Sequence, residues 1–560
     1  MPGITWESCK TYTYDWFNLG DRMTCGEVEV PVDYSHPEAG TIPVSVVRIA
    51  AAQSDHRRGV IVVNPGGPGA RTGLTFAQDV YGYWNAGDPN DPVGSLLKQI
   101  TDEYDIVGFM PRGTGTFEEV VGSGDDSGVS DPGDNALICQ SDQPVPNFID
   151  PDDRSLANIA RMQAKARTIA NGCQGASRKQ AAYVNTESTV RDLDVIRQAL
   201  GDQKISFYGT SYGTWMGTWY AALFPGNIDH LVLDSSMDFT GLFADALLNQ
   251  IGSIQSVMEA KIFPNVIRRP DYFNLGTTVA SINNTMRQLP PEVRKTVRNF
   301  NVGDILTVDP SPQYPIAGLA LAAGNGVAQL LKNNPLADLD TMLALVNKYT
   351  FSSDASAQGR ARLYARSMVK NYFSATGEQP LKLDVSASVY NAVTCNDTPL
   401  FSTDPGVWAS LGDAISIPAR FVDTEDVTGN PCIYWSNQFS AHKPDQTALK
   451  LLPPTLMLQL QFDPLTPLSG AKTLHAAIPS SSLVTVQGGV GHDVIAKEND
   501  CASKWVGEYF IHGTLPAPNT VCAANGAKSA SVYANPERAE KIREQLQQTI
   551  IDANHVGNQE

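Results

Sequence analysis

The sequence lacks the features of a membrane-spanning chain and of a nucleic-acid-binding protein. No apolar run among the 560 residues approaches the roughly 18 residues that a helix needs to cross a bilayer. Acidic side chains outnumber basic ones, and the net charge of -18 argues against the basic surface on which nucleic acids bind. We therefore expect neither nucleic acid nor a membrane among the partners. The oligomeric state stays open.

Patterns that bind metals or cofactors are also missing. None of the eight cysteines lies in a Cys-x-x-Cys pair and no group of histidines accompanies them, which argues against a zinc site. We expect no metal and no cofactor. The cysteines instead form four couples that are close in sequence, and this proximity predicts four disulfides. These are Cys9–Cys25, Cys139–Cys173, Cys395–Cys432 and Cys501–Cys522.

Disulfides on this scale predict an oxidising compartment. Asn283 and Asn396 each begin the Asn-x-Thr pattern that accepts N-linked glycans. The chain begins Met-Pro-Gly with no apolar leader, so either a signal peptide has been removed or the protein is cytosolic with free thiols. We favour a secreted glycoprotein whose signal peptide has been removed.

The strongest local signal lies at residues 205–224. An apolar run at 205–208 predicts a buried strand, and apolar residues at helical spacing follow from 214 to 224. Between them stands Gly-x-Ser-x-Gly, with Ser211 in the middle. In a strand–turn–helix context this pattern is typical of a nucleophile elbow, which exposes the serine hydroxyl at the sheet edge. An ordinary Gly/Ser-rich turn is the alternative for the pattern taken alone.

A glycine-rich loop follows an earlier buried strand. The predicted strand at 59–63, which is β-branched from Val60 onward, ends in Asn-Pro-Gly-Gly-Pro-Gly at 64–69. Without side chains in the way, the backbone N–H groups of such a loop can approach a developing oxyanion. Gly66 and Gly67 can donate in this way, whereas Pro68 has no N–H. The alternative is a tight turn with no chemistry.

An acid and a base follow two later predicted strands. The strand at 456–461 runs into Asp463, and the strand at 482–486 runs into a glycine-rich turn that ends at His492. The order Ser211, Asp463, His492 is that of α/β-hydrolases. Imidazole can take the serine proton, and a carboxylate can hold the imidazole in the required tautomer. Asp493 competes for the role of acid, but a residue adjacent to the histidine is poorly placed to meet its ring.

These motifs predict an α/β-hydrolase fold: a mostly parallel central sheet with helices on both faces and a helical lid insertion. The sheet begins with an antiparallel pair at 27–34 and 41–50. Short helical segments dominate from about 236 to 450. The predicted division is a first core part at 1–235, a lid at 236–450, a second core part at 451–525 and a C-terminal helix or tail at 526–560.

The chain resembles the secreted tripeptidyl aminopeptidase-like branch of the α/β-hydrolases, relatives of prolyl aminopeptidase. The resemblance is carried by the loop at 64–69, the elbow at 209–214, Val-Leu-Asp at 232–234, Asp-Pro-Leu-Thr-Pro at 463–467, Gly-His at 491–492 and the stretch 501–522. It implies a serine exopeptidase that acts near free N-termini. It makes Ser211 the nucleophile, Asp463 the acid and His492 the base, with Gly67 and Tyr212 as donors to the oxyanion.

The sequence departs from the family's pattern in two places, at Arg71-Thr72 after the glycine-rich loop and on either side of Pro-Arg-Gly-x-Gly. The family usually has Asp before Pro-Arg-Gly-x-Gly and Ser after it, where this chain has Met110 and Phe117. We expect both residues, together with Gly66, to lie near the substrate. A second interpretation follows, in which Met110 and Phe117 make the pocket apolar and the enzyme cleaves an ester, lactone or amide of a small non-peptide molecule.

An aminopeptidase also needs acceptors for the free α-ammonium group of its substrate. Asp397, Glu425 and Asp426 are candidates in the predicted lid, with a solvated surface position as the alternative for each. A third interpretation, from another class, is a non-catalytic binding protein on a hydrolase fold. The intact set of three catalytic residue types argues against it.

Overall fold

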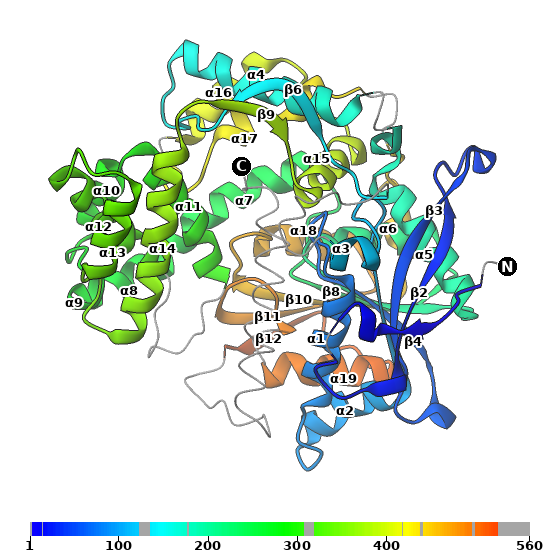
Figure 1. The fold of residues 1–560 in the computed structure, drawn as a ribbon. Helices are drawn as coiled ribbons and strands as arrows, with labels where there is room; N and C mark the ends of the chain where they lie inside the picture. Colours follow the sequence, from blue (N-terminus) through cyan, green and yellow to red (C-terminus); the bar gives the residue numbers. More distant parts are fainter. Residues whose placement is uncertain are drawn as a thin grey trace.

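The computed structural model describes residues 3–13, 15–122, 135–175, 179–306, 318–416, 418–436, 441–495 and 499–524. The helix predicted near the C-terminus lies outside these residues. Figure 1 shows a central sheet covered by helices on its two faces, with a large helical part above one edge.

Among the described residues, the central sheet has ten strands in the order β1-β2-β3-β5-β4-β7-β8-β10-β11-β12. Their bounds are β1 Glu7–Ser8, β2 Met23–Pro31, β3 Thr41–Ile49, β4 Gly59–Asn64, β5 Tyr104–Phe109, β7 Ile205–Thr210, β8 Ile228–Asp234, β10 Thr455–Phe462, β11 Ser481–Val490 and β12 Asn519–Ala523. Pairings from β1 to β5 along this order are antiparallel, and all pairings from β5 to β12 are parallel. The predicted mostly parallel sheet is confirmed.

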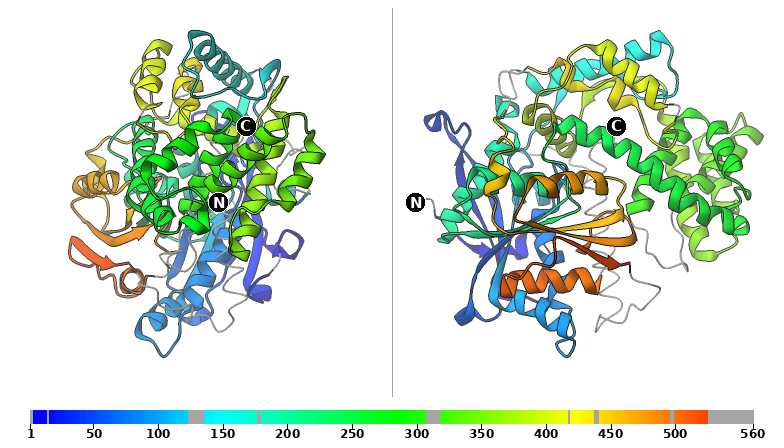
Figure 2. Two further views of the ribbon diagram at one scale, coloured as in Figure 1. Left: turned by 90° about the vertical axis from the view of Figure 1, so that its left-hand side faces the viewer. Right: turned by 180° about the vertical axis from the view of Figure 1, so that it is seen from behind.

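Successive residues of the central strands bury their side chains on opposite faces. In β4, Val60 and Val62 pack into one apolar layer, while Ile61 and Val63 pack into the other. The first layer is covered by α5 (Thr186–Leu200), α6 (Tyr212–Leu223) and α18 (Leu468–Ala477), and the second by α1 (Gly73–Asn85), α2 (Pro92–Glu103) and α19 (Asp500–His512). Figure 2 shows helices above and below the sheet. Each fully buried Val or Ile contributes roughly 1.5–3 kcal/mol, which explains the unbroken apolar runs.

The carboxyl ends of β7, β8, β10 and β11 meet at one edge of the sheet. Thr210 at the end of β7 is in register with Asp234 at the end of β8, and Asp234 is in register with Leu458 of β10. Because these strands are neighbours and parallel, the loops that follow them emerge side by side. The predicted catalytic residues all lie in or next to these loops.

A helical cap occupies the chain between β8 and β10. Its helices are α7 Phe243–Val257, α8 Phe263–Arg268, α9 Pro270–Phe273, α10 Val279–Gln288, α11 Pro291–Leu306, α12 Leu319–Asn333, α13 Leu339–Lys348, α14 Ala355–Ser374, α15 Val385–Asp397, α16 Pro405–Ser416 and α17 Glu425–Thr428. Helices α7 to α14 share an apolar core of their own. Figures 1 and 2 show this part above the carboxyl edge of the sheet.

The cap also contains a segment that the sequence analysis assigned to the core. Strand β6 (Gln140–Pro146) pairs antiparallel with β9 (Glu378–Lys382), and α4 (Leu156–Gln174) lies beside them at the top of Figure 1. The division at residue 235 misses this contribution. Strand β6 is mostly polar and exposed, so neither alternation nor an apolar run marks it as a strand.

All eight cysteines form the four disulfides that the sequence predicts. They suggest an oxidising, extracytoplasmic environment. Within the described ranges, no helix is long and apolar enough to cross a membrane.

The prediction of a glycosylation site at Asn396 is wrong. Asn396 is fully buried, its amide donates to the carbonyl oxygens of Ala181 and Val184, and its Oδ1 accepts from the indole of Trp435. A glycan on this amide is incompatible with the fold. Asn283 lies half-buried in α10 and stays a prediction.

Removing the Cys139–Cys173 disulfide tests its role in the cap. The bond joins the start of β6 to α4 and closes 34 residues of chain. Replacing both cysteines by alanine should cost roughly 4 kcal/mol, chiefly by freeing the unfolded chain, and should lower the denaturant concentration at which the cap unfolds. An unchanged unfolding midpoint would show that the bond does not constrain the cap.

Candidate active site

Ser211 lies in the turn between β7 and α6, as the elbow motif predicts. Its φ of 57° and ψ of -125° are unusual for a residue with a side chain, so the turn is held by its surroundings. A Cβ on Gly209 would overlap the carbonyl oxygen of Gly213, and a Cβ on Gly213 would lie 2.7 Å from the carbonyl oxygen of Asn64. The two flanking glycines therefore permit the close packing that keeps Ser211 in this conformation.

Asp463 and His492 form a buried pair. Nδ1 of His492 lies 2.9 Å and 3.0 Å from the two carboxylate oxygens of Asp463, and both side chains are fully shielded from solvent. The imidazole meets Asp463 and not its chain neighbour Asp493. With Nδ1 donating to the carboxylate, Nε2 is the nitrogen left to accept a proton.

Thr466 and Gln459 hold the acid in place, and sequence reasoning missed both. The Thr466 hydroxyl donates to Asp463 at 2.9 Å and lies 3.3 Å from Nδ1 of His492. The backbone N–H groups of Leu465 and Thr466 and the side-chain amide of Gln459 also donate to the carboxylate. The Asp-Pro-x-Thr spacing could have indicated the role of Thr466, because a carboxylate in such a turn accepts hydrogen bonds from the amides two and three residues further along the chain.

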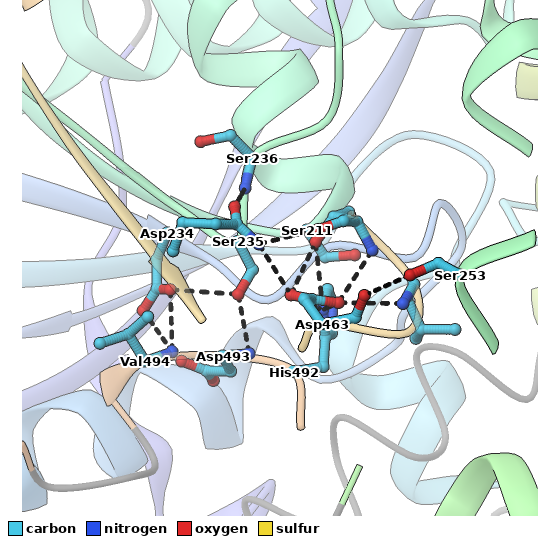
Figure 3. Close-up of polar contacts among 12 residues, drawn as sticks. Ser211, Asp234, Ser235, Ser236, Ser253, Asp463, His492, Asp493 and Val494 are labelled. Atoms are coloured by element: carbon cyan, nitrogen blue, oxygen red, sulfur yellow. Dashed lines mark hydrogen bonds and ion pairs between the residues drawn. The ribbon is translucent and has the colours of Figure 1, made fainter. Parts of the chain in front are cut away.

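The serine lies at the same sheet edge as this pair. Ser211 and Thr466 line one cavity, and Thr466 contacts both Asp463 and His492. Figure 3 shows Ser211 next to Asp463 and His492. No hydrogen bond joins Ser211 to His492 in the described part of the chain, and Nε2 of His492 is buried there without a hydrogen-bond partner. Such bonds are often long before substrate binds.

Asp234, at the end of β8, anchors the loop that carries His492. Its carboxylate accepts from the backbone N–H group of Val494 (Figure 3). It also accepts from the N–H of Ile495 and, at 2.6 Å, from the hydroxyl of Tyr208. Burial raises the pKa of Asp234, and a hydrogen bond with the side chain of Asp493, followed by those from Tyr208, Val494 and Ile495, counteracts that rise. The neighbouring Ser235 accepts from the N–H of Asp493 at 2.8 Å. Sequence reasoning gave Asp234 no role, although an aspartate that ends a buried apolar strand is unusual.

The glycine-rich loop lies against the elbow. A Cβ on Gly66 would be 2.9 Å from Cβ of Ser211, and the N–H of Gly66 already donates to Asn64. Gly67 lines the same cavity as Ser211. No acceptor among the described residues takes the N–H of Gly67 or the N–H of Tyr212, the first residue of α6. Chemically, these two amides can donate to an oxygen atom bound beside the Ser211 hydroxyl.

A cavity opens over Ser211 between the core and the cap. Its walls are mainly apolar and come largely from α7 and the segment around α17. Three carboxylates, those of Asp238, Asp423 and Asp426, and one guanidinium, that of Arg298, also line it. The cavity is thus apolar with an acidic part, which suits a substrate that carries both apolar groups and a positive charge.

Met110 and Phe117 do not line this cavity. Both are buried in the apolar layer on the α1 side of the sheet, and their backbone N–H groups donate to the carbonyl oxygen and the hydroxyl of Ser45. The expectation that they shape the substrate pocket is wrong. Their proximity to the Pro-Arg-Gly-x-Gly motif in the sequence did not indicate on which face of the sheet each side chain is buried.

Asp397 is also not a substrate-binding residue. It is fully buried and accepts from the backbone N–H and hydroxyl of Thr186 and from the indole of Trp215. Burial raises its pKa to about 7. Thr186 in turn lies 2.6 Å from the hydroxyl of Tyr212, so Asp397 ties α15 to α5 and to the elbow helix.

Glu425 faces the cap interior with its charge already compensated. Its carboxylate lies 3.1 Å from Lys165 and 2.8 Å from Lys295. Burial raises the pKa of Glu425, but the two ammonium groups outweigh that effect and hold the pKa at about 2. A substrate ammonium would have to compete with both lysines. Asp426, the third predicted candidate, does line the cavity over Ser211.

Comparison with known proteins agrees with this topology. The α/β-hydrolase fold family matches residues 122–320, and the TAP-like protein family matches residues 419–522. Tripeptidyl aminopeptidase of Streptomyces lividans is 27% identical over 93% of this chain and 87% of its own length. Serine protease Hip1 of Mycobacterium bovis is 24% identical over 93% and 91%. Carboxylesterase B of Mycobacterium tuberculosis is 27% identical over 93% and 90%.

Replacing Asp234 by asparagine tests whether it positions the histidine loop. The change places an amide NH₂ where an oxygen accepts from backbone N–H groups, so the loop should shift. We expect kcat to fall roughly 10- to 100-fold with KM nearly unchanged, because the displaced group acts in the chemical step. Asp229→Asn is the matched control, since Asp229 lies at the other end of β8 with a half-exposed side chain. Equal kcat values for the two variants would contradict the role.

Proposed function

We propose that this chain, a TAP-like α/β-hydrolase, is a serine exopeptidase that releases short peptides from free N-termini through an acyl-enzyme. The observation that carries the proposal is the buried His492–Asp463 pair at the same sheet edge as the strained Ser211, beneath a cap that encloses an acidic cavity. A secreted location, in line with the four disulfides, is part of the proposal.

In the first step, the hydroxyl oxygen of Ser211 attacks the scissile carbonyl carbon. Nε2 of His492 accepts the hydroxyl proton, and Asp463 stabilises the imidazolium that forms. The N–H groups of Gly67 and Tyr212 donate to the carbonyl oxygen as it becomes negative. His492 then gives the proton to the departing amine nitrogen, the C–N bond breaks, and the acyl part stays on Ser211 as an ester.

The second step repeats the same proton transfers with water. His492 takes a proton from the water molecule that attacks the ester carbon, and it returns that proton to the Ser211 oxygen as the ester bond breaks. The free acid leaves and the enzyme is restored. Apart from water, each step uses only the chain's own residues.

The charge of the cavity supports the proposal that the substrate carries a free amine. Three acidic side chains line the cavity against one basic side chain, that of Arg298, and the ammonium group of a free N-terminus is a positive group that such an excess of acidic side chains favours. Asp426 replaces Asp397 and Glu425 as the residue we favour for this contact. The similarity to tripeptidyl aminopeptidase and to a serine protease points in the same direction.

Hydrolysis of a small non-peptide ester is the second candidate. The similarity to a carboxylesterase and the mainly apolar cavity walls favour it. The two functions share the catalytic residues and differ in whether the substrate must carry a free amine.

A substrate panel separates the two candidates. Aminoacyl and tripeptidyl p-nitroanilides, their N-acetylated forms and short p-nitrophenyl esters are compared by kcat/KM, with Ser211→Ala as the control for non-specific hydrolysis. We expect acetylation to lower kcat/KM on the anilides roughly 10- to 100-fold, because it removes a charged hydrogen bond. Hydrolysis of the esters alone, or equal rates with and without the acetyl group, would reject the exopeptidase.

A further inference from the structure

Two serines of the cap contact the loops that carry the proposed catalytic groups. Ser253, in α7, donates its hydroxyl to the main-chain carbonyl oxygen of Asp463 at 2.7 Å (Figure 3). Ser386, in the first turn of α15, donates to the main-chain carbonyl oxygen of Gly69 at 3.0 Å. One contact is therefore made to the loop of the acid, and the other to the glycine-rich loop that contains Gly67.

The two carbonyl groups that accept these bonds depend on the cap. Asp463 and Gly69 are both buried. Within the described ranges, no backbone N–H donates to either carbonyl oxygen, and the serine hydroxyl is the side-chain donor that each receives. A buried carbonyl that loses its donor is costly. Each loop is therefore held at this point by a hydroxyl group of the cap.

The direction of the two hydroxyls is unusual for serines in helices. A helical serine commonly donates to the carbonyl one turn earlier in its own helix. Ser388 does so in α15, where its hydroxyl donates to the carbonyl oxygen of Asp384 at 2.6 Å. The hydroxyl of Ser386, in the same helix, instead leaves the helix and meets Gly69. The backbones are also close, because a Cβ on Gly69 would lie 2.6 Å from the carbonyl oxygen of Ser386.

Apolar packing joins the cap to the loops of the acid and the base. Leu465 lies two residues after Asp463, and Val490 lies two residues before His492. Both are buried in the apolar core that α7 to α14 share. The loops on either side of the His492–Asp463 contact are therefore packed into the cap, and the hydroxyl of Ser253 acts from a helix that cannot shift without disturbing this core.

Neither serine belongs to the wall that a substrate would touch. Among the described residues that line the cavity over Ser211, α7 contributes the neighbours Ile251 and Ile254 but not Ser253, and Ser386 is absent as well. The loss of either hydroxyl therefore leaves the lining side chains in place. Its effect on turnover passes through the main chain of the loop that the hydroxyl holds.

From these contacts we propose that Ser253 and Ser386 are positioning residues of the active site. Ser253 holds Asp463 in contact with His492, and Ser386 holds the loop that presents the N–H of Gly67 to the oxyanion. The inference rests on the catalytic roles proposed for the two loops, but it holds for a peptide and for an ester substrate alike. It makes the cap a part of the frame that aligns the catalytic groups, in addition to a wall of the cavity.

Serine substitutions test this proposal. Ser253→Ala and Ser386→Ala remove the hydroxyl, Ser253→Thr and Ser386→Thr keep it, and Ser256→Ala is the matched control on the exposed face of α7. The readouts are kcat and KM on the substrate that the unsubstituted enzyme hydrolyses fastest. Both alanine variants should lower kcat about tenfold and change KM by less than about twofold, because a displaced loop acts in the chemical step. The threonine variants and the control should keep kcat.

A transition-state analogue tests the role of Ser386 separately. Phenylboronic acid forms a tetrahedral adduct with a catalytic serine, and one of its oxygen atoms occupies the position of the oxyanion. Ser386→Ala should raise its inhibition constant about tenfold, less than the loss of a whole oxyanion donor would cause. Ser256→Ala should leave the constant unchanged. An unchanged constant in Ser386→Ala contradicts the role of Ser386.

The outcomes distinguish this inference from the proposed function. If the unsubstituted enzyme hydrolyses no substrate and a fluorophosphonate does not label Ser211, both fail. If the enzyme is active but the alanine variants keep its kcat, or change only KM, the function stands and the positioning role is wrong. A threonine variant that loses as much kcat as the alanine variant at the same position also contradicts the role, because the hydroxyl is then not the group that matters.

Discussion

The buried contact between His492 and Asp463 is the interaction on which the site depends. Both side chains are fully shielded, and a buried carboxylate without partners is costly, so the contact requires donors from its surroundings. Thr466, Gln459 and two backbone amides supply them. Those donors fix the loop after β10, and the imidazole in turn fixes the loop after β11. The geometry of the catalytic edge follows from satisfying one buried charge.

Two buried aspartates at this edge have different positioning roles. Asp463 meets the imidazole ring directly, whereas Asp234 binds the backbone amides of the residues that follow His492. One therefore sets the orientation of the ring and the other sets the position of the loop that carries it. Their strands, β8 and β10, are neighbours in the sheet, so both carboxylates are held by the same rigid frame. The cap adds most of the walls of the cavity over Ser211.

The fold and the central residues could be predicted from the sequence because local patterns determine them. Buried parallel strands give unbroken apolar runs, and the elbow requires glycines at 209 and 213 for steric reasons that the structure shows. Which acidic residues line the cavity over Ser211 could not be predicted in this way. Asp397, Glu425 and Asp426 look alike in sequence, yet one is bonded to Thr186, one to two lysines, and one lines the cavity. That difference arises from tertiary packing, as does the recruitment of α4 into the cap.

Covalent labelling tests most directly the claim that Ser211, His492 and Asp463 act as one unit. A fluorophosphonate reacts with a serine only when a neighbouring base activates the hydroxyl. We predict that mass spectrometry finds the phosphonyl group on Ser211, and that labelling is lost in Ser211→Ala and strongly slowed in His492→Ala and Asp463→Asn. Labelling of another serine, or equal labelling of Ser211 without His492, would contradict the account.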